Sequence, residues 1–511
     1  MQQHRIGLAI SLALACTALS SPIHAQSTED LHQLKQDLQA GKTTATQILE
    51  QYQARSTKLN PHIVAVSAVR AEAKRDAEQA DKNKNPRLIL QGLPIMVKDN
   101  IAIQGMPTTA GSLALANNMA SSDAFLVAKL RAAGAVLAGK TNLSEWANFR
   151  STKSTSGWSS VGGQTRNPYN IKKNSCGSSS GSGAAVAARL IPAAIGTETD
   201  GSIVCPAAVN GLVGFKPTLG LVSRSGIVPL SHSQDTAGPM TLTVRDAALL
   251  MNVIVGSDPS DPATQAADQH KTDYTQGLDA QALKGKRIGI VSKLVKGYDK
   301  ETLALFHRSI EILKAQGAII IDKVEIPHME AAGKDEYTVL LYDFKADLNN
   351  YLASTPATVS SRSMADVIAF NKKNAKQVMP HFGQEIMLQA QAKGPLSEQA
   401  YLDASARAKR LSGPEGIDAA LKQHQLDALI APTTGPAWDI NYKKGDVIAG
   451  SASSPAAIAG YPHLTVPMGL VKGLPVGLSF FADAWSDARL LQMGFAFEVA
   501  RPALPAPKLL K

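Results

Sequence analysis

The chain has 511 residues, of which 44% are hydrophobic, 18% are charged and 5% are aromatic, and it contains 3 cysteines. This composition excludes a disordered chain, a collagen-like chain and a small disulfide scaffold, while the length allows several domains or one large enzyme domain. The 52 basic and 42 acidic residues give a net charge of +10, but the basic residues are scattered along the chain. We therefore interpret the charge as a solvated surface and predict no nucleic-acid partner.

The first 25 residues have the pattern of a secretory signal. Arg5 precedes an apolar run at 6–15, which is too short to span a membrane, and Ala25 is a small residue at the expected cleavage position. A lipoprotein cleaved before Cys16 is an alternative, but Ala13 lies where leucine is expected. We predict removal of residues 1–25, export to the periplasm or the medium, and no stable membrane insertion.

Helices and short apolar strands alternate along the rest of the chain. We expect two helices between residues 28 and 60, with a break at Gly41 and a cap at Thr43 or Thr44. Further elements are expected in this order: a strand at 62–68, helix 69–80, strand 93–98, helix 123–133, strand 135–138, and strands at 426–432, 464–467 and 476–481. With no internal repeat and no linker, this order predicts one α/β domain over residues 26–511.

Glycine and serine are concentrated in the middle of the chain. Ten serines lie between residues 151 and 182, and eleven glycines lie between residues 157 and 220. Apolar stretches such as 184–195 interrupt this region, which distinguishes it from a flexible linker and indicates closely packed backbone. After signal removal only Cys176 and Cys205 remain, without a CxxC pair or an HExxH motif, and the histidines do not cluster at ligand spacing. We therefore predict no metal site and no cofactor.

Two motifs in the chain suggest other functions. Residues Gly134 to Thr141 satisfy the phosphate-loop pattern GxxxxGK[ST], and Asp322 at the end of an apolar run could serve a nucleotide-bound metal. However, a predicted helix precedes Gly134 and the next four residues are strand-like, whereas a phosphate loop needs the opposite order, so nucleotide binding stays a remote alternative. Gly177 to Gly181 satisfy GxSxG, but a turn-rich stretch precedes them and nothing marks His232 or His463 as a catalytic partner.

A third set of motifs covers most of the chain. Lys98 ends an apolar strand in GLPIMVKDN, Ser178 lies in CGSSSGS, and Ser202 lies in GTETDGSI. With the segments GKTNLSEW, QTRNP, FKPT, SQDTAGP and GLPVG, these motifs resemble the amidase signature family, and within it the bacterial peptide amidases, from about Leu31 to Glu498. The resemblance implies a large single domain with a mixed central sheet covered by helices on both faces.

The resemblance also implies a Ser–Ser–Lys triad. Ser202 would be the nucleophile, and Ser178, after a cis peptide bond, would link it to Lys98 as a neutral base. The backbone amides of Thr199, Asp200, Gly201 and Ser202 would form the oxyanion hole, and the N-terminus of the helix after Ser202 would favour negative charge. Ser179 and Asp99 would support these groups by hydrogen bonds.

The sequence departs from the family pattern at four positions. Cys176, Ser180 and Asp200 stand where the family has glycine, and Val204 stands where arginine is common. Because a carboxylate facing the oxyanion would oppose its charge, we predict that Asp200 points away from it. The resemblance does not suggest a bridge between Cys176 and Cys205, so we do not predict one, although an exported protein could form it if the two segments lie close.

These observations predict a monomeric amidase that hydrolyses carboxamides to acid and ammonia, with C-terminal amides of peptides as substrates. A broad acyl- or aryl-amide hydrolase is the main alternative. A glutaminase component of a tRNA-dependent enzyme is less favoured, because an export signal would separate it from tRNA.

Overall fold

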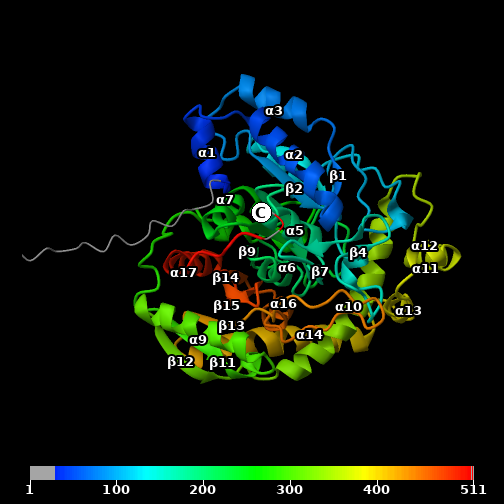
Figure 1. The fold of residues 1–511 in the computed structure, drawn as a ribbon. Coiled ribbons are helices and arrows are strands. Elements are labelled where there is room, and N and C mark those ends of the chain that lie inside the picture. The colour runs from blue at the N-terminus through cyan, green and yellow to red at the C-terminus, as the bar shows by residue number, and fades with distance from the viewer. Residues whose placement is uncertain (1–28, 508, 510–511) are drawn as a thin grey trace, which may run out of the picture.

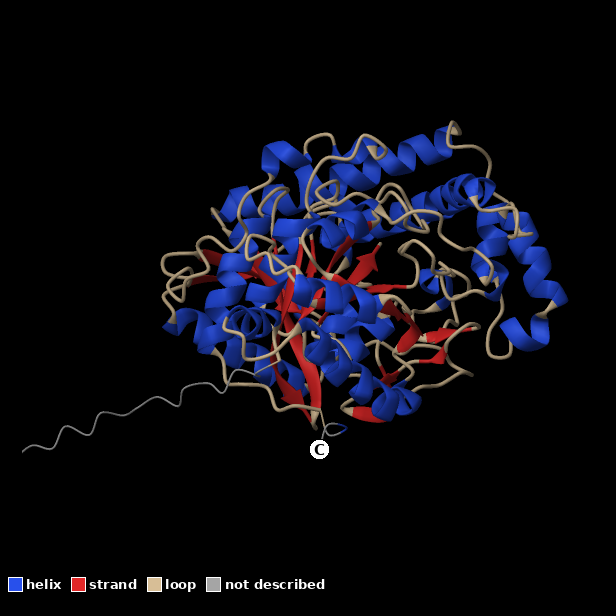
Figure 2. Cartoon of the chain, turned by 90° about the horizontal axis from the view of Figure 1, so that it is seen from above, coloured by secondary structure: helices blue, strands red, loops and turns tan. Residues whose placement is uncertain are grey.

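The computed structural model describes residues 29–507 and 509, so the predicted signal sequence, its cleavage site and Cys16 lie outside the described residues. An eleven-stranded mixed sheet runs through the protein (Figures 1 and 2). From one edge to the other the strands are β1 (Val66–Val69), β3 (Val136–Thr141), β2 (Pro94–Lys98), β8 (Ala193–Glu198), β10 (Thr236–Thr241), β9 (Val213–Lys216), β14 (His463–Val471), β15 (Leu474–Phe481), β13 (Ala428–Pro432), β11 (Arg287–Val291) and β12 (Ile319–Val324).

The sheet has a group of parallel strands toward each edge and a group of antiparallel strands in its centre. β3, β2 and β8 run parallel to one another, as do β13, β11 and β12, whereas every pair from β8 to β13 through the centre is antiparallel. Two short ribbons, β4 (Trp158–Ser159) with β5 (Gly163–Gln164) and β6 (Arg166–Asn167) with β7 (Asn170–Asn174), lie outside the main sheet. The predicted mixed sheet is therefore confirmed.

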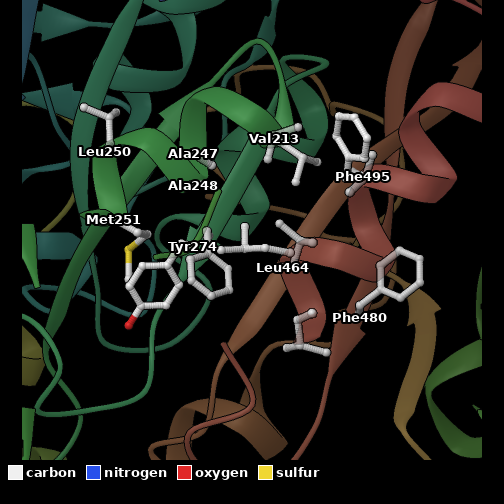
Figure 3. Close-up of a cluster of buried hydrophobic side chains, with 14 of the residues drawn as sticks. Val213, Ala247, Ala248, Leu250, Met251, Tyr274, Leu464, Phe480 and Phe495 are labelled. Atoms are coloured by element: carbon white, nitrogen blue, oxygen red, sulfur yellow. The ribbon is translucent and has the colours of Figure 1, made fainter. Parts of the chain in front are cut away.

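Helices cover both faces of the sheet, as the side chains of β2 show. Ile95 and Val97 belong to the largest hydrophobic core, while Met96 between them belongs to a second core on the opposite face. The first core includes α1 (Leu31–Gln39), α4 (Phe125–Ala132), α7 (Val244–Ile254), α9 (Lys300–Ala315), α15 (Asp418–His424) and α17 (Asp487–Ala500). Figure 3 shows α7 in this core, with Met251 next to Tyr274. The second core includes α2 (Ala45–Ile63), α3 (Ala73–Lys82), α5 (Ser180–Ala187) and α6 (Val204–Val209).

A further layer of helices follows β12 in the chain. It contains α10 (Met329–Ser354), α11 (Met364–Lys373), α12 (Ala375–Val378), α13 (Glu385–Gln391) and α14 (Gln399–Ser412), while the short helices α8 (Ala267–His270) and α16 (Ser454–Ala459) lie before and after it in sequence. Side chains of α10, α11 and α13 share a third core with Trp146, which follows β3. This layer therefore packs against the part of the molecule that carries Lys98 and the two serines. Within the described residues, no helix has the length and apolar content needed to cross a membrane.

Most of the expected elements are present, with shifted ends. Thr44 caps α2 by accepting a hydrogen bond from the Gln47 amide, as predicted. The predicted strand at 62–68 begins too early, because α2 continues through Pro61 to Ile63 and the strand starts only at Val66. The side chain of Asn60 explains the boundary: its carbonyl oxygen accepts from the amides of Ala65 and Val66 and so closes the helix-to-strand turn.

Candidate active site

Lys98 is the last residue of β2, and its side chain is completely buried. Its Nζ lies 2.7 Å from Ser178 Oγ, 2.8 Å from Thr197 Oγ1 and 3.3 Å from the carbonyl oxygen of Thr197. A neutral amine has two hydrogens and one lone pair. If both hydrogens go to the two Thr197 oxygens, the lone pair faces Ser178 and can accept its proton.

The surroundings of Lys98 favour its neutral form. Burial lowers the pKa of Lys98 to about 7, and the negative charges of Asp235 and Glu198 offset part of this effect. A lysine with this pKa is partly deprotonated at neutral pH, whereas a solvated lysine is almost fully charged. A neutral amine at this place can accept a proton, which is the property that a general base needs.

Ser178 lies between β7 and α5 and is fully buried. The peptide bond between Gly177 and Ser178 is cis, as the resemblance implied. The Ser178 carbonyl oxygen accepts from the Ser144 amide at 3.0 Å. Any Cβ at position 177 would overlap Ser144 Oγ, so only glycine fits beside Ser178.

Ser202 lies in the turn between β8 and α6, and it lines a cavity of about 380 Å³. Its carbonyl oxygen accepts from the Ser179 amide at 3.1 Å, so the two serine segments are joined by a main-chain hydrogen bond. Gly201 has a φ of +80°, a left-handed conformation that glycine adopts without steric cost. In the described part of the chain, the amides of Thr199, Asp200, Gly201 and Ser202 donate to no protein acceptor, so all four predicted donors are free to bind an oxyanion.

The N-terminus of α6 differs from the sequence expectation. Its first amides are not available to a substrate, because Glu198 Oε2 accepts from Ile203 at 2.7 Å and from Val204 at 3.0 Å. The helix is also only six residues long. A fixed carboxylate therefore already occupies the position where we expected the helix to favour a developing negative charge. The expectation that this helix N-terminus would favour an oxyanion is therefore not met by its first two amides.

Two contacts hold the side chains of this turn. Thr199 Oγ1 donates to Asp235 Oδ1 at 2.6 Å, and the other oxygen of Asp235 accepts from the amides of Leu230 and Ser231. Asp200 Oδ2 accepts from Ser454 Oγ at 2.6 Å, at the start of α16. The Asp200 side chain is therefore turned toward α16, but Asp200 also lines the cavity that contains Ser202, so its orientation away from an oxyanion stays a prediction. The sequence reasoning missed Asp235, although it lies in the SQDTAGP segment.

Ser179 and Asp99 have different surroundings. Ser179 Oγ donates to the carbonyl oxygen of Thr197 at 3.0 Å and accepts from the Thr197 amide at 3.2 Å, so it braces the residue that contacts Lys98. Asp99 instead pairs with Lys140 at 3.4 Å and accepts from Thr109. Thr197 was also missed, because no sequence pattern shows that its side chain faces Lys98.

Cys176 and Cys205 form a disulfide, which the sequence reasoning did not predict. The S–S distance is 2.03 Å and the two Cα atoms are 6.0 Å apart. The residues are 29 positions apart in sequence and become neighbours because the Ser178 and Ser202 segments pack together. Neither the composition nor the family motifs contain this information.

Two adjoining cavities meet at this site. The Ser202 cavity also includes Gly177, Asp200 and both cysteines. The second, which we call the Trp146 cavity, measures about 510 Å³ and is lined by apolar side chains such as Trp146 and Phe344 together with polar and charged ones such as Arg224, His232 and Asp347. Ala147, Thr199 and Leu230 line both cavities. A substrate with a carbonyl group near Ser202 could therefore extend past Thr199 into the Trp146 cavity, which offers both apolar and polar contacts.

The phosphate-loop match has no suitable geometry. Gly134 follows α4, and Lys140 lies within the buried strand β3, where its Nζ donates to the Pro107 carbonyl oxygen and to Thr108. Asp322 lies in β12, at the opposite edge of the sheet from β3. The loop that would cradle a phosphate is absent at this place, and the matching residues belong to the core.

The nucleophile-elbow match also lacks its partners. Its central Ser179 is preceded by the ribbon strand β7, which is not part of the main sheet. His463 is buried and bonds to Ser479, while His232 Nδ1 lies 2.9 Å from Asp347 and 3.6 Å from Asp343. Ligand atoms of His232, Asp343 and Asp347 lie within 4.8 Å of one another, a grouping that sequence spacing did not reveal. The hydrogen bond to Asp347 raises the pKa of His232, which favours an ion pair there.

Comparison with known proteins identifies the family. The family model described as amidase matches residues 47–491. The chain belongs to the amidase family. This amidase is 40% identical over 483 residues to a probable amidase of Arabidopsis thaliana, covering 92% of this chain and 89% of the plant protein. It is 33% identical to one component of the glutamyl-tRNA(Gln) amidotransferase of Pseudomonas fluorescens, covering 92% of this chain and 96% of the bacterial one.

A solved structure resembles the amidase more strongly than these sequences do. The native peptide amidase of Stenotrophomonas maltophilia superposes with a TM-score of 0.90 and 48% identity, covering 95% of this chain and 99% of that one. The fold class is thereby confirmed, and the amidase is a hydrolase of amide C–N bonds.

Proposed function

We propose that the amidase hydrolyses primary carboxamides with Ser202 as nucleophile, Ser178 as the linking hydroxyl and Lys98 as base. The contact of 2.7 Å between Lys98 Nζ and Ser178 Oγ carries this proposal, because it joins a depressed-pKa lysine to a serine whose neighbour Ser179 is bonded to Ser202. An unassisted serine hydroxyl is a poor nucleophile and needs such a base.

The reaction follows from these positions. Lys98 accepts the proton of Ser178, Ser178 accepts that of Ser202, and Ser202 Oγ bonds to the amide carbon. The oxyanion that forms is bound by the free amides of residues 199–202. The relay then returns the proton to the amide nitrogen, the C–N bond breaks and ammonia leaves. Water attacks the acyl ester by the same relay, which releases the acid and restores Ser202.

We propose that the substrates are C-terminal amides of peptides. The similarity to a peptide amidase supports this class, and the Trp146 cavity offers space for residues that precede the amide. A broad acyl- or aryl-amide hydrolase is the alternative. The similarity to the amidotransferase component adds glutamine as a third candidate amide.

One assay tests mechanism and substrate together. Ammonia release is measured for the purified protein with a dipeptide C-terminal amide, a small aryl amide and glutamine, and repeated with Ser202→Ala and Lys98→Ala. We expect the peptide amide to give the highest kcat/KM and both variants to lose at least about 10³-fold in kcat. Undiminished activity of Ser202→Ala would overturn the triad, and equal kcat/KM on all three amides would overturn the peptide preference.

We further propose that the amidase is exported. The N-terminal pattern supports this location, and so does the Cys176–Cys205 bridge, because disulfides persist in oxidising compartments. Fractionation of the native host and mass measurement of the mature chain test it. A cytosolic protein that retains residues 1–25 would contradict export.

A further inference from the structure

The two proposed catalytic serines lie within one small closed loop of the molecule. On one side, the disulfide joins Cys176 to Cys205. On the other side, the Ser179 amide donates to the Ser202 carbonyl oxygen at 3.1 Å. The loop therefore runs from Cys176 through Gly177 and Ser178 to Ser179, crosses by the hydrogen bond to Ser202, continues through Ile203 and Val204 to Cys205, and returns through the two sulfur atoms.

Without the disulfide, this loop would be open next to the reacting atoms. Ser178 is two residues from Cys176, and Ser202 is three residues from Cys205, so the bridge is the nearest covalent tie between the two hydroxyls. The remaining nearby ties are hydrogen bonds, such as that from the Cys205 amide to the Gly201 carbonyl oxygen at 2.9 Å. Hydrogen bonds also hold the Ser178 side of the loop, including one that the Cys176 amide donates to Asn174 Oδ1 at 2.8 Å.

We propose that the Cys176–Cys205 disulfide is a positioning element that sets the distance between Ser178 and Ser202, so that the amidase reaches its full rate only in the oxidised state. This inference rests on the proposed function of the two serines. A proton relay works only over hydrogen-bond distances, and a displacement of about 1 Å in a reacting group can lower a rate by about 100-fold.

The bridge borders a cavity from which a small reductant would have to approach it. Both cysteines line the Ser202 cavity, and Cys205 is 8% exposed. A dithiol would attack one sulfur through its thiolate, form a mixed disulfide and then close on itself as a cyclic disulfide. The protein sulfurs take up two electrons and two protons, and the dithiol loses them. Oxidation state would then control the rate of amide hydrolysis at this site.

The experiment compares three forms of the full-length mature protein. They are the oxidised wild type, the wild type reduced with dithiothreitol, and the double variant Cys176→Ala/Cys205→Ala, each assayed for ammonia release from a peptide amide well below its unfolding temperature. We expect reduction to lower kcat by about 10- to 100-fold with a change in KM of less than about 3-fold. The double variant should show the same low kcat, and dithiothreitol should not affect it.

Hydrogen exchange gives a second readout that does not depend on activity. Reduction should accelerate exchange of the amides at Ser179 and Cys205, while amides of the remote strand β11 stay protected. If the double variant fails to fold, the reduced wild type carries the comparison. Equal kcat in the oxidised and reduced wild type would overturn this inference alone. No ammonia release from the oxidised enzyme would overturn the proposed function and this inference with it.

Discussion

The oxygen atoms around Lys98 determine the direction in which the lone pair of its neutral amine points. In a fully buried site, each hydrogen of the amine needs an acceptor, and Thr197 provides both a hydroxyl and a carbonyl oxygen. Asn100 Nδ2 donates to the same hydroxyl at 3.0 Å and holds Thr197 in place. Ser178 is then the one remaining partner of Nζ among the described residues, so the basic electron pair points along the proposed relay.

The pH dependence of the amidase should follow the charge on Lys98. Because burial lowers its pKa to about 7, the neutral base is the minor form below pH 7 and the major form above it. We expect kcat/KM to rise with pH, to reach half its plateau near pH 7 and to be level by about pH 8.5. A pH profile of ammonia release from a peptide amide measures this. A flat profile between pH 5.5 and 8.5 would contradict the assignment of Lys98 as base.

Replacing Thr197 tests the orientation of the lone pair. Thr197→Val keeps the shape but removes the hydroxyl, so one hydrogen of Lys98 loses its acceptor and the amine can rotate away from Ser178. Losing a buried hydrogen bond of this kind costs about 1.5–3 kcal/mol, which corresponds to a decrease in kcat of about 10- to 100-fold. Thr197→Ser keeps the hydroxyl and serves as the matched control. If the two variants have equal kcat and equal pH profiles, Thr197 has no orienting role.

The turn between β8 and α6 must satisfy two structural requirements. Gly201 has a φ of +80°, and a Cβ there would lie 3.0 Å from Ser453 Oγ. The turn must also keep its amides free, which Glu198 helps to achieve by binding only the amides beyond Ser202. We therefore expect both the backbone shape and the close packing of this turn to be needed to position Ser202, the proposed nucleophile.

A pair of glycine variants separates the cost of the left-handed backbone conformation from the effect on the proposed oxyanion amides. Gly105 has the same φ of +80°, but a Cβ there would meet no atom within 4 Å. Gly201→Ala and Gly105→Ala should both destabilise the protein, each by about 1–2 kcal/mol, because alanine disfavours this conformation. Only Gly201→Ala should lower kcat, by at least about 10-fold, because it moves the oxyanion amides. Urea unfolding and ammonia release measure the two effects, and an unchanged kcat in Gly201→Ala would remove the turn from the proposed site.

Local sequence patterns predicted the positions of helices and strands better than they predicted the contacts between them. Apolar periodicity located β2, β3 and β13, and the motifs located Lys98, Ser178 and Ser202. The roles of Thr197, Asp235 and Glu198 and the Cys176–Cys205 bridge depend on segments that meet only in the folded sheet. Single-sequence patterns record spacing along the chain, so contacts between strands that are distant in sequence leave no signal there.

One buried arginine joins the central sheet to the layer of helices that follows β12. Arg150 is completely buried after β3, and its guanidinium contacts Glu145 Oε2 at 2.9 Å, the Val378 carbonyl oxygen at 2.7 Å and the Phe382 carbonyl oxygen at 3.3 Å. It also lies over the rings of Phe382 and Trp158. The end of α12 and the loop before α13 are thereby anchored beside the Trp146 region, which lines the proposed peptide space.

Removing this anchor should destabilise the whole protein. Arg150→Met leaves Glu145 buried without its cation and two carbonyl oxygens without a donor, and breaking a buried pair in this way costs about 3–5 kcal/mol. Arg150→Lys should recover only part of this, because one ammonium cannot reproduce the planar set of donors. Thermal and urea unfolding measure the loss. Lys314→Ala, which breaks the exposed pair with Glu311, serves as the control and should change little.

The loss in Arg150→Met should also depend on pH. Burial already raises the pKa of Glu145 to about 7 with Arg150 present, and without the arginine the pKa should rise further. Between pH 4.5, the ordinary value, and this raised value, the folded variant binds more protons than the unfolded chain, so its stability falls as the pH rises. The difference in unfolding free energy between wild type and Arg150→Met should therefore be larger at pH 8 than at pH 5.5. A difference that is equal at both pH values would show that Glu145 is not the group left uncompensated.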